Sequence, residues 1–229
     1  LSRAGGGRSL ARGEPPPVDH NARKTVCHAV IPAAGLSRRM GVPKLLLEVA
    51  GKPVIARLIE ALLTGGVDSV HILVREEDTS LRDLLANQPV TVALAPNGTP
   101  DMRRSVELLL QTIQQDQQPQ AGDAWLLCPA DHPILAADVI TELLAARSNH
   151  PAAILVPVCG QRRGHPTLFP WPIAAAVNSI PAGQGINWLL REQSLPVVEV
   201  PVTTRSILLD LDTPEDYRRL LEDSGQANA

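Results

Sequence analysis

Apolar residues recur along the chain with two different spacings, and the two alternate from residue 25 onward. Continuous apolar runs of strand length indicate buried strands, whereas apolar residues that return every three or four positions indicate helices with one buried face. The predicted strands are 26–31, 69–74, 90–95, 124–128 and 152–158. The predicted helices are one from Pro53 to the Gly65-Gly66 stop, one at 78–87, a longer one from Met102, and one at 137–147.

Strands that alternate with helices indicate βαβ units. We therefore expect an α/β fold with a doubly wound, mainly parallel sheet. After Gly160 the rhythm loosens. There we expect short strands at 166–169, 197–202 and 207–209, and helices at 185–193 and 214–222.

The first residues of the chain differ in composition from the rest. Residues 1–24 are rich in Gly, Arg and Pro and lack the apolar stretch of a secretion signal. We predict that they form a flexible extension and that residues 25–229 form a single domain.

Composition narrows the class of protein. The 229 residues are 44% hydrophobic and carry a net charge of -3, so nothing indicates a nucleic-acid partner, and aromatics at 2% are too few for base stacking. No apolar run is long enough to predict a membrane span. Cys27, Cys128 and Cys159 are far apart and odd in number, which favours buried thiols in a cytoplasmic protein.

Ligands of a doubly wound sheet bind beyond the carboxyl ends of its strands. Three places fall there: the loop after the first strand, Asp131, and the Asp210/Asp212 pair after the predicted 207–209 strand. We expect the binding site at this edge.

The loop at 33–44 combines small residues with cations. Ala33, Ala34 and Gly35 allow close approach of a ligand to backbone N–H groups, and Arg38, Arg39 and Lys44 are donors for phosphate oxygens. The loop matches neither the P-loop nor the dinucleotide motif. By composition alone, a phosphate-binding loop and a surface loop with solvated arginines are both open.

Two carboxylates suit magnesium, which prefers hard oxygen ligands. Asp131 directly follows the apolar run at 124–128, where its alternative role is a helix N-cap or turn residue. Thr213 and Pro214 predict a helix start, so Asp212, just before the cap, can face the site. We favour Asp212 over Asp210 as the second ligand.

Other polar residues permit two interpretations each. His132 and His165 have a side chain suited to acid–base chemistry, although many such histidines are structural. Arg103 and Arg104 open a helix, where cations oppose the helix dipole. An anionic partner nearby would explain them, and so would solvation.

Several motifs together resemble one family. The segment Ile31–Leu46, written IPAAGLSRRMGVPKLL, is similar to the signature of the MobA-like nucleotidyltransferases, and most similar to the molybdenum cofactor cytidylyltransferases. The resemblance runs from Val26 to Leu220. It includes GKPV at 51–54, PADHP at 129–133, GHP at 164–166 and DLDTPEDY at 210–217. It implies a Rossmann-like fold of the nucleotide-diphospho-sugar transferase type.

The resemblance also implies roles for residues. The nucleotide would be bound by Pro32, Ala33, Ala34, Gly35, Ser37, Arg38, Arg39 and Lys44. Arg39, Lys44 and Asp131 would be catalytic, Asp131 and Asp212 would hold Mg²⁺, and His165 and Arg103 would bind the acceptor. Ala33-Ala34-Gly35 resembles members that use CTP, whereas relatives that use guanine usually have Ala-Gly-Gly.

The expected reaction is transfer of CMP from CTP to the molybdopterin form of the molybdenum cofactor, with pyrophosphate released. A molybdenum oxidoreductase is a possible client. The segment at 182–187 departs from the family pattern Gly-Asp-x-Gly-Ala-Arg and lacks its acidic residue. GTP as donor, a sugar or alditol phosphate as acceptor, or a non-catalytic cofactor chaperone therefore stay open.

Overall fold

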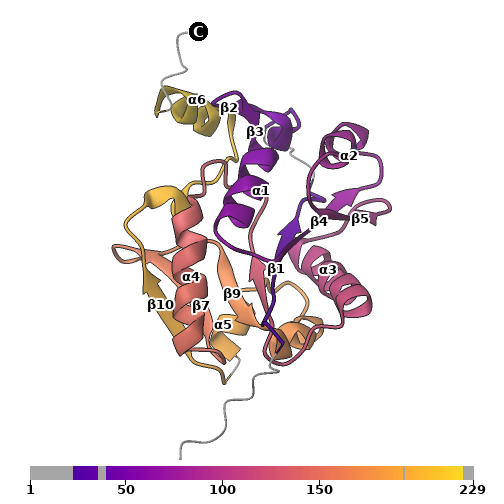
Figure 1. Cartoon of the computed structure of the whole chain (residues 1–229). Coiled ribbons are helices and arrows are strands. Elements are labelled where there is room, and N and C mark those ends of the chain that lie inside the picture. Colours follow the sequence, from indigo (N-terminus) through magenta and orange to yellow (C-terminus); the bar gives the residue numbers. More distant parts are fainter. Residues whose placement is uncertain (1–22, 36–39, 193, 224–229) are drawn as a thin grey trace, which may run out of the picture.

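A single eight-stranded sheet forms the centre of the protein (Figure 1). The computed structural model describes residues 23–35, 40–192 and 194–223. The strand order is β10-β7-β9-β6-β1-β4-β5, and β8 pairs with β7. The strands are β1 (Cys27–Pro32), β4 (Ser69–Arg75), β5 (Thr91–Ala95), β6 (Ala124–Leu127), β7 (Ile154–Cys159), β8 (Arg162–Arg163), β9 (Thr167–Pro170) and β10 (Val197–Pro201).

Most strands of the sheet point in the same direction. β1 pairs in parallel with β4 and β6, β4 with β5, and β7 with β10. β9 runs antiparallel between β6 and β7, so β6 and β7 share one direction despite the reversed strand between them. The carboxyl ends of β1, β4, β5 and β6 therefore lie at one edge, as predicted.

Helices cover both faces of the sheet (Figure 1). The helices are α1 (Val54–Thr64), α2 (Thr79–Leu85), α3 (Met102–Gln117), α4 (Ala137–Asn149), α5 (Trp188–Glu192) and α6 (Pro214–Asp223). α1, α2 and α4 contribute to one buried apolar cluster, and α3 and α5 to another. In β1, Ala29 and Ile31 enter the first cluster and Val30 the second, so the doubly wound fold is confirmed.

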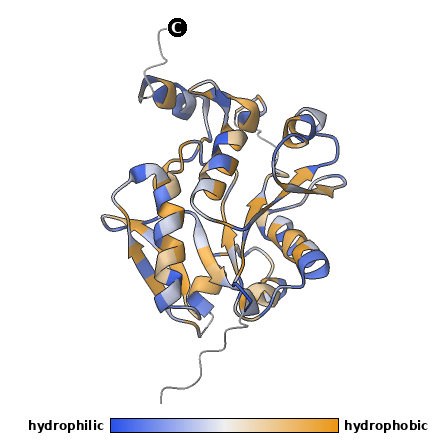
Figure 2. Ribbon diagram, in the orientation of Figure 1, coloured by the Kyte–Doolittle hydropathy of each residue, from blue (hydrophilic) through white to orange (hydrophobic). Residues whose placement is uncertain are grey.

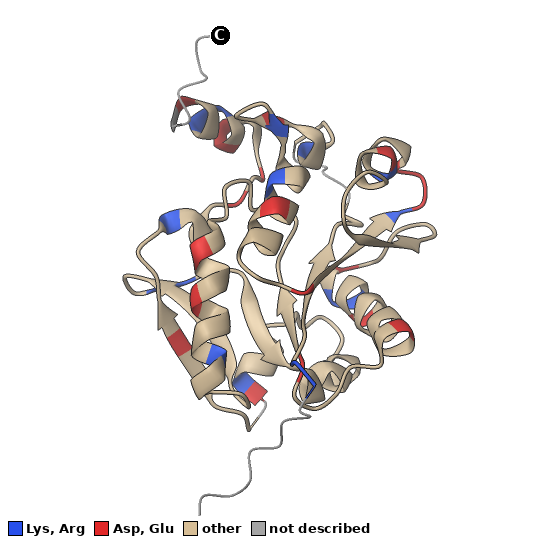
Figure 3. Cartoon of the chain, viewed as in Figure 1, with Lys and Arg blue, Asp and Glu red and all other residues tan. Residues whose placement is uncertain are grey.

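Hydropathy and charge follow this layering. In Figure 2 the strands are largely hydrophobic and the helices carry hydrophilic outer faces. In Figure 3 the charged residues lie mostly on helices and loops, and the central strands carry few. Among the described residues, no helix has both the length and the apolar character to span a membrane.

The predicted strand at 207–209 is wrong. These residues belong mainly to a 3₁₀ turn, η3 (Arg205–Leu208), whose start is capped because the Thr204 hydroxyl accepts a hydrogen bond from Ser206 N. A short apolar run fits a buried turn as well as a strand. The sequence did not predict the hairpin of β2 (Glu48–Val49) and β3 (Lys52–Pro53), the short strand β8, η1 (Lys44–Leu46) or η2 (Trp171–Ser179).

Two aspartates fix the start of the central strand. Val26 N donates to Asp123 Oδ1 over 2.7 Å, and Cys27 N donates to Asp68 Oδ2 over 2.8 Å. Asp123 is buried. These bonds hold the amino-terminal edge of the sheet, opposite the edge where the loops after β1, β5 and β6 meet.

Candidate active site

A cavity of about 680 Å³ opens at the carboxyl edge of the sheet. Its walls are the loop after β1 (32–35), the segment after β5 (97–102), the segment after β6 (129–131), and the side chains of Lys44 and Asp212. Of the predicted site residues, the cavity therefore gathers Pro32, Ala33, Ala34, Gly35, Lys44, Asp131 and Asp212.

The small residues after β1 are held tightly against the sheet. Ala33 N donates to Leu73 O of β4 over 2.9 Å, and Ala33 and Ala34 are both buried. A larger side chain at either position would displace neighbouring atoms of the core. The loop thus brings its backbone to the cavity wall without side chains in the way.

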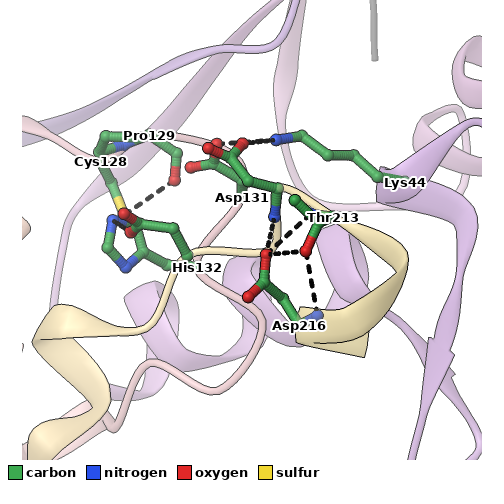
Figure 4. Close-up of polar contacts among 9 residues, drawn as sticks. Lys44, Cys128, Pro129, Asp131, His132, Thr213 and Asp216 are labelled. Carbon is green, nitrogen blue, oxygen red and sulfur yellow. Dashed lines mark hydrogen bonds and ion pairs between the residues drawn. The ribbon is translucent and has the colours of Figure 1, made fainter. Parts of the chain in front are cut away.

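Lys44 contacts both predicted metal ligands, and its position beside Asp131 is drawn in Figure 4. Its Nζ donates to Asp131 Oδ2 over 2.9 Å and to Asp212 Oδ1 over 3.0 Å. Burial disfavours the charged amine, but the hydrogen bonds and charges of Asp131 and Asp212 outweigh burial and raise the pKa of Lys44. The ammonium is therefore charged throughout the neutral range.

Backbone and side-chain bonds position the two aspartates. Leu211 N donates to Asp131 O over 2.9 Å, which ties the segment before α6 to the end of β6. Asp216 accepts from Thr213 N over 2.8 Å, and Asp216 N donates to Thr213 Oγ1 over 3.2 Å (Figure 4). This reciprocal cap starts α6 and orders the backbone beside Asp212.

The donor set at this point fits a hard divalent cation. Asp131 and Asp212 both contact the same nitrogen of Lys44, so their carboxylates converge on one small region of the cavity. Mg²⁺ is usually bound by one or two carboxylates with phosphate oxygens and water completing its coordination. The open cavity leaves room for those phosphates.

Beside Asp131 lies a second polar group, around His132. Its Nε2 lies 3.3 Å from Asp210 Oδ1, and its ring packs edge-on against His165 at a centroid distance of 5.5 Å. Burial lowers the pKa of His132, although the nearby Asp210 carboxylate opposes the change. Burial also lowers the pKa of His165, to about 4, with the neighbouring His132 adding to the effect.

The predicted acceptor residues lie away from the main cavity. His165 lines a smaller cavity of about 330 Å³ together with Arg163, Asn187 and Arg191. Arg103 lies on α3 between cavity residues Met102 and Ser105 without itself lining the cavity. The predictions for Ser37, Arg38 and Arg39 lie outside the described residues.

Sequence reasoning missed the segment after β5. Asn97 and Gly98 both have positive φ angles, 61° and 72°, and Thr99 Oγ1 lies 2.6 Å from Ser105 Oγ. All four residues line the main cavity. The signal was present, since an Asn-Gly turn follows a predicted strand, which places it at the ligand-binding edge.

A family model decides the classification of the chain. The model described as "MobA-like NTP transferase domain" matches residues 29–197, which is most of the chain. The chain belongs to this family. The match includes Lys44 and Asp131 and ends before Asp210 and Asp212.

Curated relatives of this MobA-like transferase differ in substrate. A molybdenum cofactor guanylyltransferase of Rhodopseudomonas palustris is 29% identical over 224 residues, covering 88% of this chain and 93% of that protein. A 2-C-methyl-D-erythritol 4-phosphate cytidylyltransferase of Shewanella amazonensis is 34% identical over 136 residues, covering 57% of this chain. The chain covers 55% of that cytidylyltransferase's length.

Solved structures show the same fold. Rv0371c of Mycobacterium tuberculosis matches with a TM-score of 0.75 and 25% identity, covering 88% of this chain and 100% of that one. A manganese complex of Rv0371c matches with a TM-score of 0.70, covering 86% and 99% of the two chains at the same identity. These matches confirm the Rossmann-like fold expected for a nucleotidyltransferase.

Proposed function

We propose that this MobA-like transferase moves CMP from CTP to the molybdopterin form of the molybdenum cofactor, with Mg²⁺ as its metal. One observation carries the proposal. Asp131, Asp212 and Lys44 converge at the wall of a cavity that is also bordered by the small residues of the 32–35 loop. Carboxylates for a metal and a cation for phosphates meet where a nucleotide would bind.

The proposed reaction needs no covalent enzyme intermediate. An oxygen of the acceptor's terminal phosphate forms a bond to the α-phosphorus of the nucleotide. The bond from that phosphorus to the bridging oxygen breaks, and pyrophosphate leaves with the electron pair. Positioning and neutralisation of charge supply most of the catalysis in such transfers.

Each group in the centre has a separate task. Lys44 balances the charge that develops on the departing pyrophosphate, and Arg39 is proposed to assist it. Asp131 and Asp212 would hold the Mg²⁺, which supplies Lewis-acid polarisation of the nucleotide phosphates when bound. The backbone of Ala33, Ala34 and Gly35 would bind the nucleotide.

The donor base separates two versions of this proposal. Ala33-Ala34-Gly35 supports CTP, because members that use guanine usually have Ala-Gly-Gly there. GTP is the second candidate, since a relative that covers 88% of this chain is a guanylyltransferase. The erythritol phosphate cytidylyltransferase supports CTP while suggesting an alditol phosphate as acceptor.

The acceptor is proposed to bind on the side of the smaller cavity. His165 lines that cavity and its ring contacts His132, the neighbour of Asp131. Gly183 stands where cytidylyltransferase relatives have an acidic residue, and its φ of 80° suits glycine. Arg103 is proposed to contact the acceptor from α3, and a molybdenum oxidoreductase is the proposed client.

Pyrophosphate release tests the proposal directly. The purified protein is incubated with Mg²⁺, molybdopterin-type cofactor or erythritol phosphate, and CTP or GTP in turn. Release with CTP and the molybdenum cofactor is expected, and Asp131→Asn should lower the rate by about 100-fold or more. Asp83→Asn changes an exposed carboxylate of α2 and is the matched control.

The other outcomes are equally informative. Release with GTP alone would replace the donor, and release with erythritol phosphate alone would replace the acceptor. Cofactor binding without release for any nucleotide would support the chaperone alternative. Asp131→Asn turnover at the rate of the unmodified protein would overturn the metal assignment.

A further inference from the structure

A buried histidine faces two carboxylates beside the proposed magnesium ligands. His132 is 1% exposed, and its Nε2 lies 3.3 Å from Asp210 Oδ1. One potential ligand atom each from Asp131, His132 and Asp210 lies within 4.8 Å of the other two. Asp212 is not part of this group, so the cluster shares only Asp131 with the pair that contacts Lys44.

The ring of His132 has unsatisfied polar atoms. Among the described residues, neither its Nδ1 nor its Nε2 has a hydrogen-bond partner, although Asp210 Oδ1 lies 3.3 Å from Nε2. A buried polar atom without a partner is costly and needs an explanation. A bound cation would use the unshared electron pair of one nitrogen.

The backbone explains how two neighbouring aspartates serve different partners. Leu211 N donates to Asp131 O over 2.9 Å, which fixes the residue between Asp210 and Asp212. Asp212 reaches Lys44 on one side, and Asp210 reaches His132 on the other. Asp131 lies between them and can contribute to either group.

The local charge favours a cation. Asp131, Asp210 and Asp212 bring three carboxylates, and Lys44 is the cation that contacts two of them. The third carboxylate, Asp210, is half exposed and gives a cation a route from solvent to the buried ring. Concentrated negative charge of this kind attracts and binds divalent cations.

We propose that Asp131, His132 and Asp210 form a subsite for a divalent transition-metal cation such as Mn²⁺. An imidazole with two carboxylates suits manganese, iron, cobalt or zinc, whereas Mg²⁺ prefers oxygen ligands and retains water. A cation about 2.1 Å from each ligand needs ligands about 3 Å apart at right angles, close to the His132–Asp210 separation. Small movements of the Asp131 side chain complete the set.

This inference rests on the proposed function only in sharing Asp131 with it. Its test therefore uses Mn²⁺ alone, without nucleotide or acceptor, and reads metal binding rather than turnover. A failure of pyrophosphate release would leave this result untouched. A failure of metal binding here would leave the Asp131–Asp212 proposal in place.

The test is pulsed electron paramagnetic resonance of the full chain with Mn²⁺. A histidine ligand produces a ¹⁴N coupling to the bound ion. The coupling is expected in the unmodified protein and is expected to disappear in His132→Phe. In a titration of free Mn²⁺, Asp210→Ala should weaken that binding by about 10-fold or more.

Two controls keep the result decisive. Asp83→Ala removes an exposed carboxylate of α2 and should bind Mn²⁺ unchanged. Asp212→Asn should preserve the ¹⁴N coupling, since it alters only the neighbouring pair. Each variant is first treated with chelator and compared with the unmodified protein by thermal unfolding. If His132→Phe fails to fold, Asp210→Ala still tests the subsite, because Asp210 is exposed.

Specific results would overturn the subsite. These are an absent ¹⁴N coupling in the unmodified protein, unchanged Mn²⁺ affinity in Asp210→Ala, or loss of the coupling in Asp212→Asn. The last would mean that any nitrogen-bound cation depends on the Lys44 side of the centre.

Discussion

At the scale of single residues, Lys44 links the charges of the site. Its ammonium contacts both Asp131 and Asp212, so it holds two like charges close together before any ligand binds. Two roles follow from one position. In the proposed reaction Lys44 would support the phosphates of a nucleotide, and it would compete electrostatically with a metal for the same carboxylates.

Replacing Lys44 should separate these two roles. We expect Lys44→Met to lower the pyrophosphate release rate by about 100-fold, because a cation at the phosphates is lost. The same variant should bind Mn²⁺ more tightly without nucleotide, because a positive charge between the carboxylates is gone. Activity assays and a Mn²⁺ titration measure both effects.

Lys52→Met is the control for that variant. Lys52 forms an exposed ion pair with Glu60, and exposed pairs contribute little to stability. Weaker Mn²⁺ binding in Lys44→Met would contradict the electrostatic argument.

Gly164, which lines the smaller cavity, is expected to be equally sensitive to substitution. A Cβ atom at Gly164 would lie 2.2 Å from Ile207 O, and that backbone continues directly to Asp210. We expect Gly164→Ala to cost about 1–3 kcal/mol of unfolding free energy in urea. Gly185→Ala, where no atom lies within 4 Å of the new Cβ, should unfold like the unmodified protein.

At the scale of elements, aspartate carboxylates accept hydrogen bonds from backbone N–H groups at the start of β1. Asp123 accepts from Val26 N and Gln120 N over 2.7 and 2.8 Å and lies 3.5 Å from Arg23. It thereby joins the start of β1 to the turn before β6. These bonds to Asp123 therefore help to position β1 and β6, whose opposite ends lead to the main cavity.

Truncating Asp123 should destabilise the fold. Asp123→Ala leaves two backbone N–H groups without their acceptor, and we expect a loss of about 3 kcal/mol of unfolding free energy. Equilibrium urea unfolding measures it, with exposed Asp83→Ala as the control. Equal midpoints for both variants would show that water replaces the carboxylate.

The elements also show what the sequence could predict. The strands that begin at Cys27, Ser69 and Thr91 were predicted within a few residues, because buried parallel strands have continuous apolar sequences. The run at 207–209 was wrongly predicted as a strand, because Ile207 is buried from a 3₁₀ turn and Leu209 is 40% exposed. That turn still delivers Asp212 to the site, because the bond from Leu211 N to Asp131 O fixes it.

Some positions of the candidate site could be predicted from the sequence and others could not. The position of Asp131 and Lys44 at the cavity wall could be predicted, because Asp131 follows a predicted strand and Lys44 ends the loop motif. The contact of His132 with Asp210 was not, because it joins segments about 80 positions apart through a turn that no periodicity describes.

At the scale of the whole molecule, buried histidines couple stability to pH. His28 Nδ1 lies 2.8 Å from Ser69 Oγ, and Ser69 Oγ lies 3.0 Å from His71 Nε2. Burial lowers the pKa of His71 to about 4, with the nearby His28 adding to the effect and Asp116 opposing it. Burial lowers the pKa of His28 as well.

The sign of the pH effect follows from those shifts. The unfolded chain protonates His71 near pH 6.5 and the folded chain near pH 4, so the unfolded state binds more protons between these values. The contribution of His71 to the free energy of unfolding is therefore present above pH 6.5. It is lost as the pH falls toward 4, which lowers stability by about 3 kcal/mol. Urea midpoints at pH 7.5 and pH 5 measure the loss.

A substitution isolates this contribution. His71→Gln removes the titration, so its stability should fall less between pH 7.5 and pH 5 than that of the unmodified protein. Parallel pH profiles would mean that other groups, such as His132 and His165, cause the acid sensitivity.

The contact between Lys44 and Asp212 joins positions 168 residues apart in the chain. During synthesis, β1, β4, β5 and β6 can leave the ribosome and pair while Asp212 is still unmade. A nascent chain can thus form this part of the sheet and the loop after β1 before its charge centre is complete. The Lys44–Asp212 contact can form only after the segment before α6 has left the ribosome.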